Sequence, residues 1–172
     1  MAQPHISTAA MSLLFMLFAS LVASAALKLP DCSPHALSIT PPFGTDIQSI
    51  KASPVHNYSI FVPQNGASPP ISTNFTNLDF CNVTIPYIHP GQKGKIHVQV
   101  WLPFNWNGRF QGSGGGGWAA GLGAMSLAPG VALGYATATT DAGHSETDPT
   151  DSWALNSPGN VDFNALQDFA AT

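Results

Sequence analysis

The alternation of apolar and polar positions predicts its clearest element, a β-strand, over residues 95–102. The run reads Lys-Ile-His-Val-Gln-Val-Trp-Leu, so successive side chains change character with a period of two. This period places His97, Gln99 and Trp101 on one face of the strand and the aliphatic residues on the other. Pro90-Gly91 before the run and Pro103 after it are turn signals that bound the strand.

A strand, a glycine-rich run, a helix and a second strand follow in order. Residues 109–111 predict a short buried strand, and residues 118–133 predict a helix that is interrupted at Pro129. Gly134 suits the position just past the C-terminus of this helix. Residues 135–140 are small and β-branched, which is typical of a strand inside a parallel sheet. This order is that of a βαβ unit, and it places the chain in the α/β class.

The remaining segments are mostly polar. Residues 27–90 are rich in Pro, Ser, Thr and Asn with short apolar pieces between them, which predicts a loop-rich, partly β N-terminal cover before a second region over 91–172. Residues 141–160 predict a long polar loop. Asp162 is placed to cap a last helix from Phe163, which has no stop signal, so we expect a fragment that ends within that helix.

The first 26 residues predict a secretory signal peptide, because an apolar run is followed by the small-residue pattern Ala23-Ser-Ala25. A membrane anchor is the alternative, but the run is short of the roughly 20 residues that a span needs. Three glycosylation sequons follow, at Asn57, Asn74 and Asn82. We therefore expect a secreted, extracellular glycoprotein without a membrane partner.

Composition narrows the class of partners. Only 8% of the 172 residues are charged and the net charge is −4, which argues against nucleic-acid binding. Cys32 and Cys81 are the two cysteines, and they fit an oxidising compartment. Paired, they would close a loop of about 50 residues and stabilise the fold by about 4 kcal/mol. The alternative is that one or both bond outside this chain; we expect the internal bridge.

The densest chemical signal is the glycine run, since five of the ten residues from Arg109 to Trp118 are glycine. Bare backbone N–H groups can bind an anion or a developing oxyanion. The candidate oxyanion donors are Gly115, Gly116 and Gly117, with Trp118 as a candidate wall of the site. Two alternatives remain: a glycine hinge without a ligand, and a dinucleotide site at Gly112–Gly117 with Asp141 binding the ribose.

The loop after the last predicted strand holds further titratable residues. His144 with Asp141 resembles a base and its orienting acid, and Ser145 lies in a near match to Gly-x-Ser-x-Gly. No helix is predicted after Ser145, as a nucleophile elbow requires, so we favour a structural histidine in a solvated acidic loop. The spacing of the acidic residues matches neither the EF-hand loop nor a two-His helix motif, and we expect no metal in this chain.

Several segments together resemble the tannase and feruloyl esterase family of secreted fungal hydrolases. They are residues 97–103, 106–112, 114–118, 140–144, 157–161 and 166–169. The resemblance implies an α/β-hydrolase fold, here incomplete, with its first strands and a βαβ unit after the N-terminal cover. It also implies a carboxylic ester hydrolase that cleaves phenolic esters of gallate or ferulate type with a Ser–His–Asp triad.

The resemblance further implies parts that this sequence does not carry. The family's nucleophile lies in a Cys-Ser-x-Gly-Gly segment, which is absent, so we expect the triad beyond residue 172 and no activity from this chain alone. The family often holds calcium in a lid domain, which is equally absent. Neither Cys32 nor Cys81 has the neighbours of the family's active-site disulfide, which favours a structural bridge. A secreted, non-catalytic binding module is the alternative function, and the oligomeric state stays open.

Overall fold

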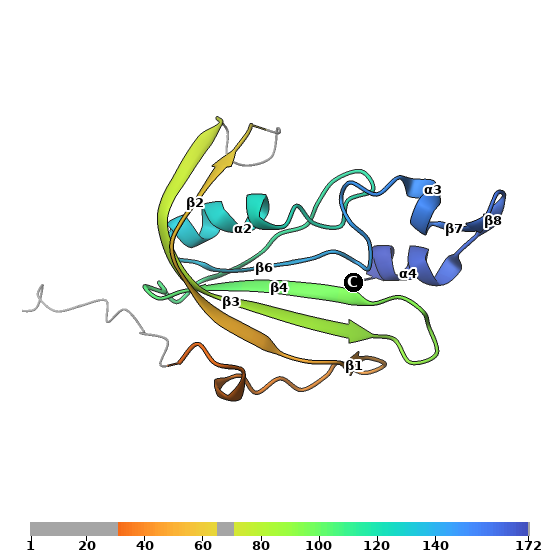
Figure 1. Ribbon diagram of the computed structural model, residues 1–172, viewed down its shortest axis with the longest axis horizontal. Coiled ribbons are helices and arrows are strands. Elements are labelled where there is room, and N and C mark those ends of the chain that lie inside the picture. Colours follow the sequence, from red (N-terminus) through yellow and green to blue (C-terminus); the bar gives the residue numbers. More distant parts are fainter. Residues whose placement is uncertain (1–30, 65–70, 172) are drawn as a thin grey trace, which may run out of the picture.

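A mixed β-sheet organises the molecule. The computed structural model describes residues 31–64 and 71–171, so the predicted signal peptide over residues 1–26 lies outside the described residues. The six-stranded sheet has the order β1-β3-β4-β6-β5, with β2 also paired to β3, and β7 and β8 form a separate pair (Figure 1). The elements are η1 (Pro34–Ala36), β1 (Asp46–Ile47), β2 (Lys51–Val62), β3 (Thr73–Ile88), β4 (Ile96–Pro103), β5 (Phe110–Gly112), α2 (Ala124–Ala132), β6 (Ala136–Thr140), α3 (Thr150–Trp153), β7 (Leu155–Ser157), β8 (Asn160–Val161) and α4 (Phe163–Ala171).

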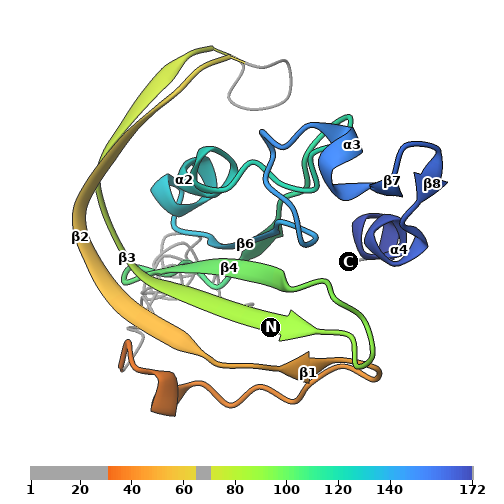
Figure 2. The ribbon, with the colours of Figure 1, turned by 45° about the vertical axis from the view of Figure 1, so that its right-hand side comes forward.

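The hairpin of β2 and β3 contains more strand than the sequence pattern indicated. Its two strands are antiparallel and curve around α2, which lies on their concave side (Figures 1 and 2). Pro54 and register shifts near Asn57 interrupt the alternation along β2, which is tolerated because β3 is the one partner of β2 among the described strands. β3 continues into the sheet and pairs with β4, so strands from both sides of the proposed boundary at residue 90 share one sheet.

The βαβ unit is confirmed, since β5 and β6 pair in parallel with α2 between them. The predicted strand at 95–102 is confirmed as β4, which pairs antiparallel with β6 and makes the sheet mixed. The expectation that residues 109–111 are buried was wrong, because the Phe110 side chain is 64% exposed. In the described part of the chain β5 is an edge strand with β6 as its one partner.

The core lies between α2 and one face of the sheet. Leu127, Ala128 and Val131 of α2 pack against Leu78, Phe80 and Trp101. The rings of Phe80 and Trp101 stack with their centroids 4.0 Å apart. This burial of apolar surface is the main force that holds the helix in place, because a nine-residue helix is marginal by itself.

Two features of α2 differ from the prediction. The helix begins at Ala124 rather than 118, and it continues through Pro129 instead of breaking there. A proline removes one backbone hydrogen bond, and the packing of the buried face compensates for it. The predicted role of Gly134 is confirmed: its φ is 78°, and its N–H donates to the Val131 carbonyl at 2.9 Å in the manner of a Schellman cap.

The predicted polar loop at 141–160 is partly ordered into α3 and the β7–β8 hairpin, so its description as a continuous loop was wrong. A hairpin forms there because Gly159 takes a positive φ of 74° at the turn. The predicted cap of the last helix is confirmed, since Oδ1 of Asp162 accepts the N–H of Ala165 at 3.1 Å. Asp168 of α4 is buried, and its Oδ1 lies 2.9 Å from Nδ1 of His89, the residue that follows β3.

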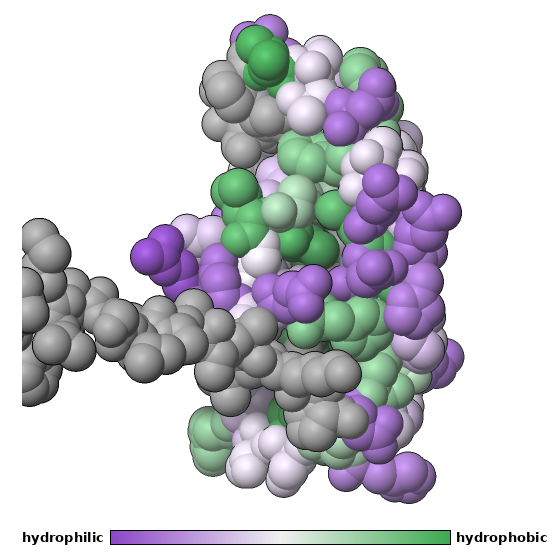
Figure 3. All heavy atoms as spheres, turned by 90° about the vertical axis from the view of Figure 1, so that its left-hand side faces the viewer, coloured by the Kyte–Doolittle hydropathy of each residue, from purple (hydrophilic) through white to green (hydrophobic). Residues whose placement is uncertain are grey.

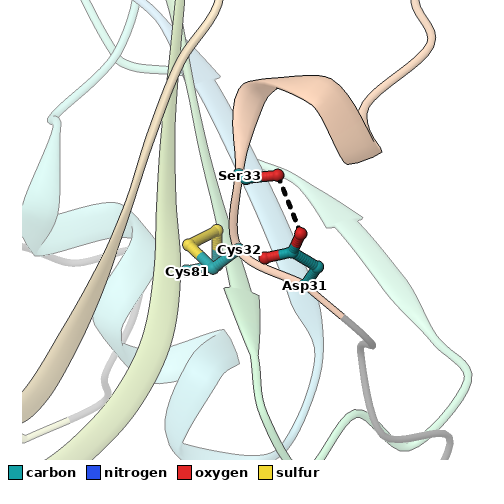
Figure 4. The surroundings of a disulfide bond; sticks show 4 residues. All are labelled: Asp31, Cys32, Ser33 and Cys81. Atoms are coloured by element: carbon teal, nitrogen blue, oxygen red, sulfur yellow. Dashed lines mark hydrogen bonds between the residues drawn. A yellow bond between two sulfur atoms is a disulfide. The ribbon is translucent and has the colours of Figure 1, made fainter.

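The predicted disulfide between Cys32 and Cys81 is confirmed and joins the N-terminal segment to β3 (Figure 4). Phe80 faces α2, so the alternation of side chains along β3 directs Cys81 to the opposite face of the sheet. The disulfide therefore holds residues 31–47 against the face that α2 leaves uncovered.

The outer surface mixes polar and apolar residues. Figure 3 shows apolar side chains between polar ones on the side of the β2–β3 hairpin. None of the helices in the described ranges is long and apolar enough to cross a membrane.

We predict that removing the disulfide destabilises the fold substantially. Cys32→Ala with Cys81→Ala should lower the free energy of unfolding by about 4 kcal/mol, because the bond closes a loop with a sequence separation of 49. Urea unfolding followed by circular dichroism measures this difference. Reductant should destabilise the parent chain equally and leave the double variant unchanged; equal stabilities with and without reductant in the parent would contradict the prediction.

Candidate functional site

The segment that joins β5 to α2, residues 113–123, lies at the carboxyl ends of β5 and β6 and is called the glycine loop below. In open α/β sheets, ligands bind outside the carboxyl ends of the parallel strands. The N–H of Ser113 still donates to the Ala138 carbonyl at 2.8 Å, as an extension of the parallel pairing. The chain leaves the sheet after this residue, so the glycines project beyond its edge.

The backbone amides of the glycine loop are largely unpaired. Within the described ranges, the N–H groups from Gly114 to Trp118 donate no hydrogen bond, whereas the N–H of Ala119 donates to the Gly116 carbonyl at 3.2 Å. Residues 114–118 are all exposed. Unpaired, accessible amides are what an anion-binding or oxyanion-binding loop requires.

Close packing of the loop on itself explains part of its glycine content. A Cβ at Gly115 would overlap the carbonyl oxygen of Ala119, so no side chain fits at that position. Gly117 has a φ of 63°, in the left-handed region that favours glycine. A Cβ at Gly116 would meet no atom within 4 Å, so packing does not explain why residue 116 is a glycine.

Trp118 and three partners anchor the end of the glycine run. Nε2 of His144 lies 2.8 Å from the Trp118 carbonyl oxygen, and its ring stacks on Trp153 with the centroids 3.9 Å apart. Phe169 of α4 contacts the rings of Trp118, His144 and Trp153. These four side chains form the aromatic cluster. The Trp118 side chain is 56% exposed, and so it stays a candidate wall of the site.

Asp141 pairs with a different histidine from the one weighed in the sequence. Its Oδ2 lies 2.7 Å from Nδ1 of His97, and its Oδ1 accepts the backbone N–H groups of His97 at 2.8 Å and Gly143 at 2.9 Å. His144 bonds Trp118 instead. The sequence contained no signal for the His97–Asp141 pair, because it depends on the antiparallel pairing of β4 with β6.

A cavity of about 550 Å³ lies beside the glycine loop, between residues 121–125 and the end of the sheet. His97, Gln99, Thr139 and Asp141 line it from β4 and β6, and His144 from the following loop. Thr139 and His144 are both buried, and Thr139 Oγ1 and His144 Nδ1 have no hydrogen-bond partner among the described residues. Unsatisfied polar atoms of this kind suit a cavity that holds water or a small polar molecule.

The other sequence candidates do not assemble into a reactive centre in the described ranges. Ser145 Oγ contacts Thr147 Oγ1 at 3.0 Å, and no serine or threonine hydroxyl there bonds a histidine ring. Among the described residues, no three acidic, histidine or cysteine side chains converge on a possible metal position. The dinucleotide alternative loses its geometry, because α2 begins at Ala124 and not beside Gly117.

Arg109 carries a guanidinium whose affinity for protons is raised. Arg109 Nη1 donates to the Tyr135 hydroxyl at 3.0 Å, and this hydrogen bond raises the pKa of the guanidinium above its usual value. Arg109 precedes β5, at the opposite end of that strand from the glycine loop. Its charge therefore does not contribute to the loop directly.

We predict that Asp141→Asn weakens the fold, because an amide replaces a carboxylate that accepts from His97 and Gly143. The expected loss of unfolding free energy is about 1–3 kcal/mol. The matched control is Asp148→Asn in the same loop, which accepts one exposed N–H from Ser145 and should change stability by less than about 0.5 kcal/mol. Thermal unfolding of both variants makes the comparison, and equal losses would contradict the prediction.

Comparison with known proteins agrees with the resemblance read from the motifs. The family model described as "Tannase and feruloyl esterase" matches residues 81–171. The match begins at Cys81 on β3 and so includes β4, the βαβ unit, the glycine loop and α4.

Curated relatives come from fungi. A "Probable feruloyl esterase" of Arthroderma benhamiae is 46% identical over 100 residues, which are 56% of this chain and 18% of that protein. A "Tannase" of Aspergillus oryzae is 33% identical over 98 residues, which are 55% of this chain and 16% of that protein. The chain thus spans less than a fifth of the length of these two relatives.

Solved structures agree with the fold. "Tannin acyl hydrolase from Aspergillus niger" superposes with a TM-score of 0.60 at 30% identity, over 76% of this chain and 23% of that one. An esterase from Aspergillus oryzae gives a TM-score of 0.52 at 25% identity, over 80% and 25% of the two chains. The sheet is therefore part of an α/β-hydrolase-type fold, as expected. The chain belongs to the tannase and feruloyl esterase family.

Proposed function

We propose that this chain forms the N-terminal part of a secreted carboxylic ester hydrolase that acts on phenolic esters of gallate or ferulate type. The names of its relatives, feruloyl esterase and tannase, support the substrate class. The structural observation that carries the proposal is the run of unpaired, exposed amides from Gly114 to Trp118 at the carboxyl end of β5.

These amides act on the charge that develops during acyl transfer. When a serine attacks an ester carbonyl, negative charge accumulates on the carbonyl oxygen, and N–H donors about 2.7–3.1 Å from that oxygen stabilise the transition state. One such donor is worth about 2.7–4 kcal/mol. α/β-Hydrolases take one donor from a loop of this kind and another from the residue after the nucleophile. Gly115, Gly116 and Gly117 are the proposed contributors here.

The position of the nucleophile follows from this geometry. The attacking oxygen and the oxyanion donors must both reach one carbonyl group, so the serine must lie next to the glycine loop. The described strands leave one edge of β5 open, and we place the strand that carries the serine there. The Ser, His and Asp of the triad come from sequence outside these 172 residues, in keeping with the small share of each relative that the chain covers.

We predict that this glycine loop supports catalysis when the missing parts are supplied. In the test, a chimera is made in which residues 81–171 replace the matching segment of the Aspergillus oryzae tannase. Its hydrolysis of methyl gallate and methyl ferulate is measured, and the unfused chain is the inactive control. Gly115→Ala in the chimera should lower kcat by about 100-fold, because its Cβ displaces the Ala119 carbonyl and the amides around it.

Gly116→Ala is the matched control for this substitution, because a Cβ there meets no protein atom within 4 Å. It should leave the thermal stability unchanged and reduce kcat much less than Gly115→Ala. A chimera that folds, as judged by circular dichroism, but cleaves neither ester would contradict the proposal and favour a non-catalytic binding module.

We further predict which sequons carry glycans in the secreted protein. Asn57 and Asn74 are exposed on the β2–β3 hairpin, whereas Asn82 is half-buried and its Oδ1 accepts from Gln99 Nε2 at 3.3 Å. A glycan requires the amide nitrogen to face solvent, so we expect occupancy at Asn57 and Asn74 and none at Asn82. Enzymatic deglycosylation in heavy-oxygen water with mass spectrometry reads each site, and a labelled residue 82 would contradict the assignment. Thr76→Ala should remove the label at Asn74 alone.

A further inference from the structure

We infer that His144 is a positioning residue that sets the direction of the Gly117 amide through a short relay of hydrogen bonds. The relay runs from the His144 ring to the Trp118 carbonyl, and from the Ala119 amide to the Gly116 carbonyl. The inference rests on the proposed function, because it identifies which glycine amide is held ready for an oxyanion.

The first step is the contact between His144 and Trp118. Nε2 of His144 lies 2.8 Å from the Trp118 carbonyl oxygen, and since a carbonyl only accepts, Nε2 carries the proton. The side chain is only 7% exposed and stacks on Trp153 at an interplanar angle of 10°. The imidazole therefore cannot swing away without breaking the stack, and it holds this carbonyl in one direction.

The second step follows from the planarity of the peptide unit. The Trp118 carbonyl and the Ala119 N–H belong to one trans peptide and point in opposite directions. Fixing the carbonyl oxygen toward His144 thus directs the Ala119 N–H away from it. That N–H donates to the Gly116 carbonyl at 3.2 Å, back into the middle of the glycine run.

The third step repeats the same geometry one peptide earlier. The Gly116 carbonyl shares a planar unit with the Gly117 N–H, so this N–H points away from Ala119. It has no partner among the described residues, and Gly117 is exposed. The relay therefore ends in one unpaired donor of defined direction, which separates Gly117 from Gly115 and Gly116.

A relay of this kind answers a physical problem of the loop. Consecutive glycines have more backbone freedom than any other residues, so an unsupported run would sample many amide directions. Oxyanion donors are effective only when they are oriented before the reaction begins. Packing of Trp118 on Trp153 and Phe169 fixes the side chain of the residue whose carbonyl His144 binds, so both parts of Trp118 are held.

Three variants of the 172-residue chain test the relay by NMR with ¹⁵N-glycine labelling. His144→Phe keeps an aromatic ring on Trp153 and removes the donor, and it should shift and broaden the amide signals of Gly114–Gly117. His144→Gln retains an N–H donor near the position of Nε2, so its glycine signals should match those of the parent chain. His97→Phe is the control, because it removes the partner of Asp141 but keeps the hydrogen bond between His144 and Trp118. It should leave the four glycine signals unchanged.

The relay would be overturned if the four amide signals shifted and broadened in both phenylalanine variants, or in neither. So would a parent chain without dispersed glycine signals, because the relay needs the aromatic cluster to form in this chain. The NMR outcome does not depend on catalysis, so the relay can fail while the proposed function stands.

Kinetics in the tannase chimera provide the functional readout. His144→Phe should lower kcat by about 10- to 100-fold with KM unchanged, since the amide acts on the transition state, and His144→Gln should recover most of the loss. A rise in KM with kcat unchanged would overturn the inference. An inactive parent chimera, by contrast, would count against the proposed function, and the NMR experiment alone would then test the relay.

Discussion

The parallel pairing of β5 with β6 is the constraint on which the site depends. It places the ends of two strands side by side, so that the glycine loop after β5 and the loop after β6 leave the sheet at the same edge. His144 can reach Trp118 only because of this arrangement, although they are far apart in the sequence. The helix between the strands secures the pairing, since its buried face is held by Phe80 and Trp101.

The face of the sheet beneath α2 is divided by chemistry along β4. Trp101 lies in the apolar core under the helix, whereas Gln99 and His97 on the same face line the polar cavity beyond the helix N-terminus. The change from apolar to polar occurs within one strand, where the cover changes from helix to loop. Side chains on one face of β4 therefore belong to the core at one end of the strand and to the site at the other. The period of two predicts which face of the sheet a side chain occupies, but not whether a helix or a loop lies over it.

Local patterns predicted the elements whose signals are local. The alternation at 95–102, the glycine after α2 and the cap at Asp162 each depend on neighbours within a few residues, and the structure confirms them. The β2–β3 hairpin was underestimated because Pro54 and the bulge near Asn57 break the alternation on an edge strand. The start of α2 was misplaced because residues 118–123 have helix-compatible apolar positions but belong to the glycine loop.

The candidate site shows the same division. The glycine run itself was visible in the sequence, because few other roles explain so many adjacent glycines. The partners of Asp141 and His144 were not visible, since each bond crosses between segments that only the sheet brings together. Sequence alone offered Asp141 and His144 as a pair with each other. The pairing of β4 with β6 gives Asp141 the partner His97, and the pairing of β5 with β6 brings His144 to Trp118.

The disulfide has a consequence for the order in which the chain matures. Cys32 and Cys81 are both synthesised before β4, β5 and β6, so in a secreted chain the covalent link can close while the later strands are still on the ribosome. The N-terminal segment would then already be fastened behind β3 when β4 arrives. For a secreted chain, oxidation in the lumen would thus fix the N-terminal segment before the rest of the sheet forms, and a copy retained in a reducing cytosol would form its sheet without this covalent link.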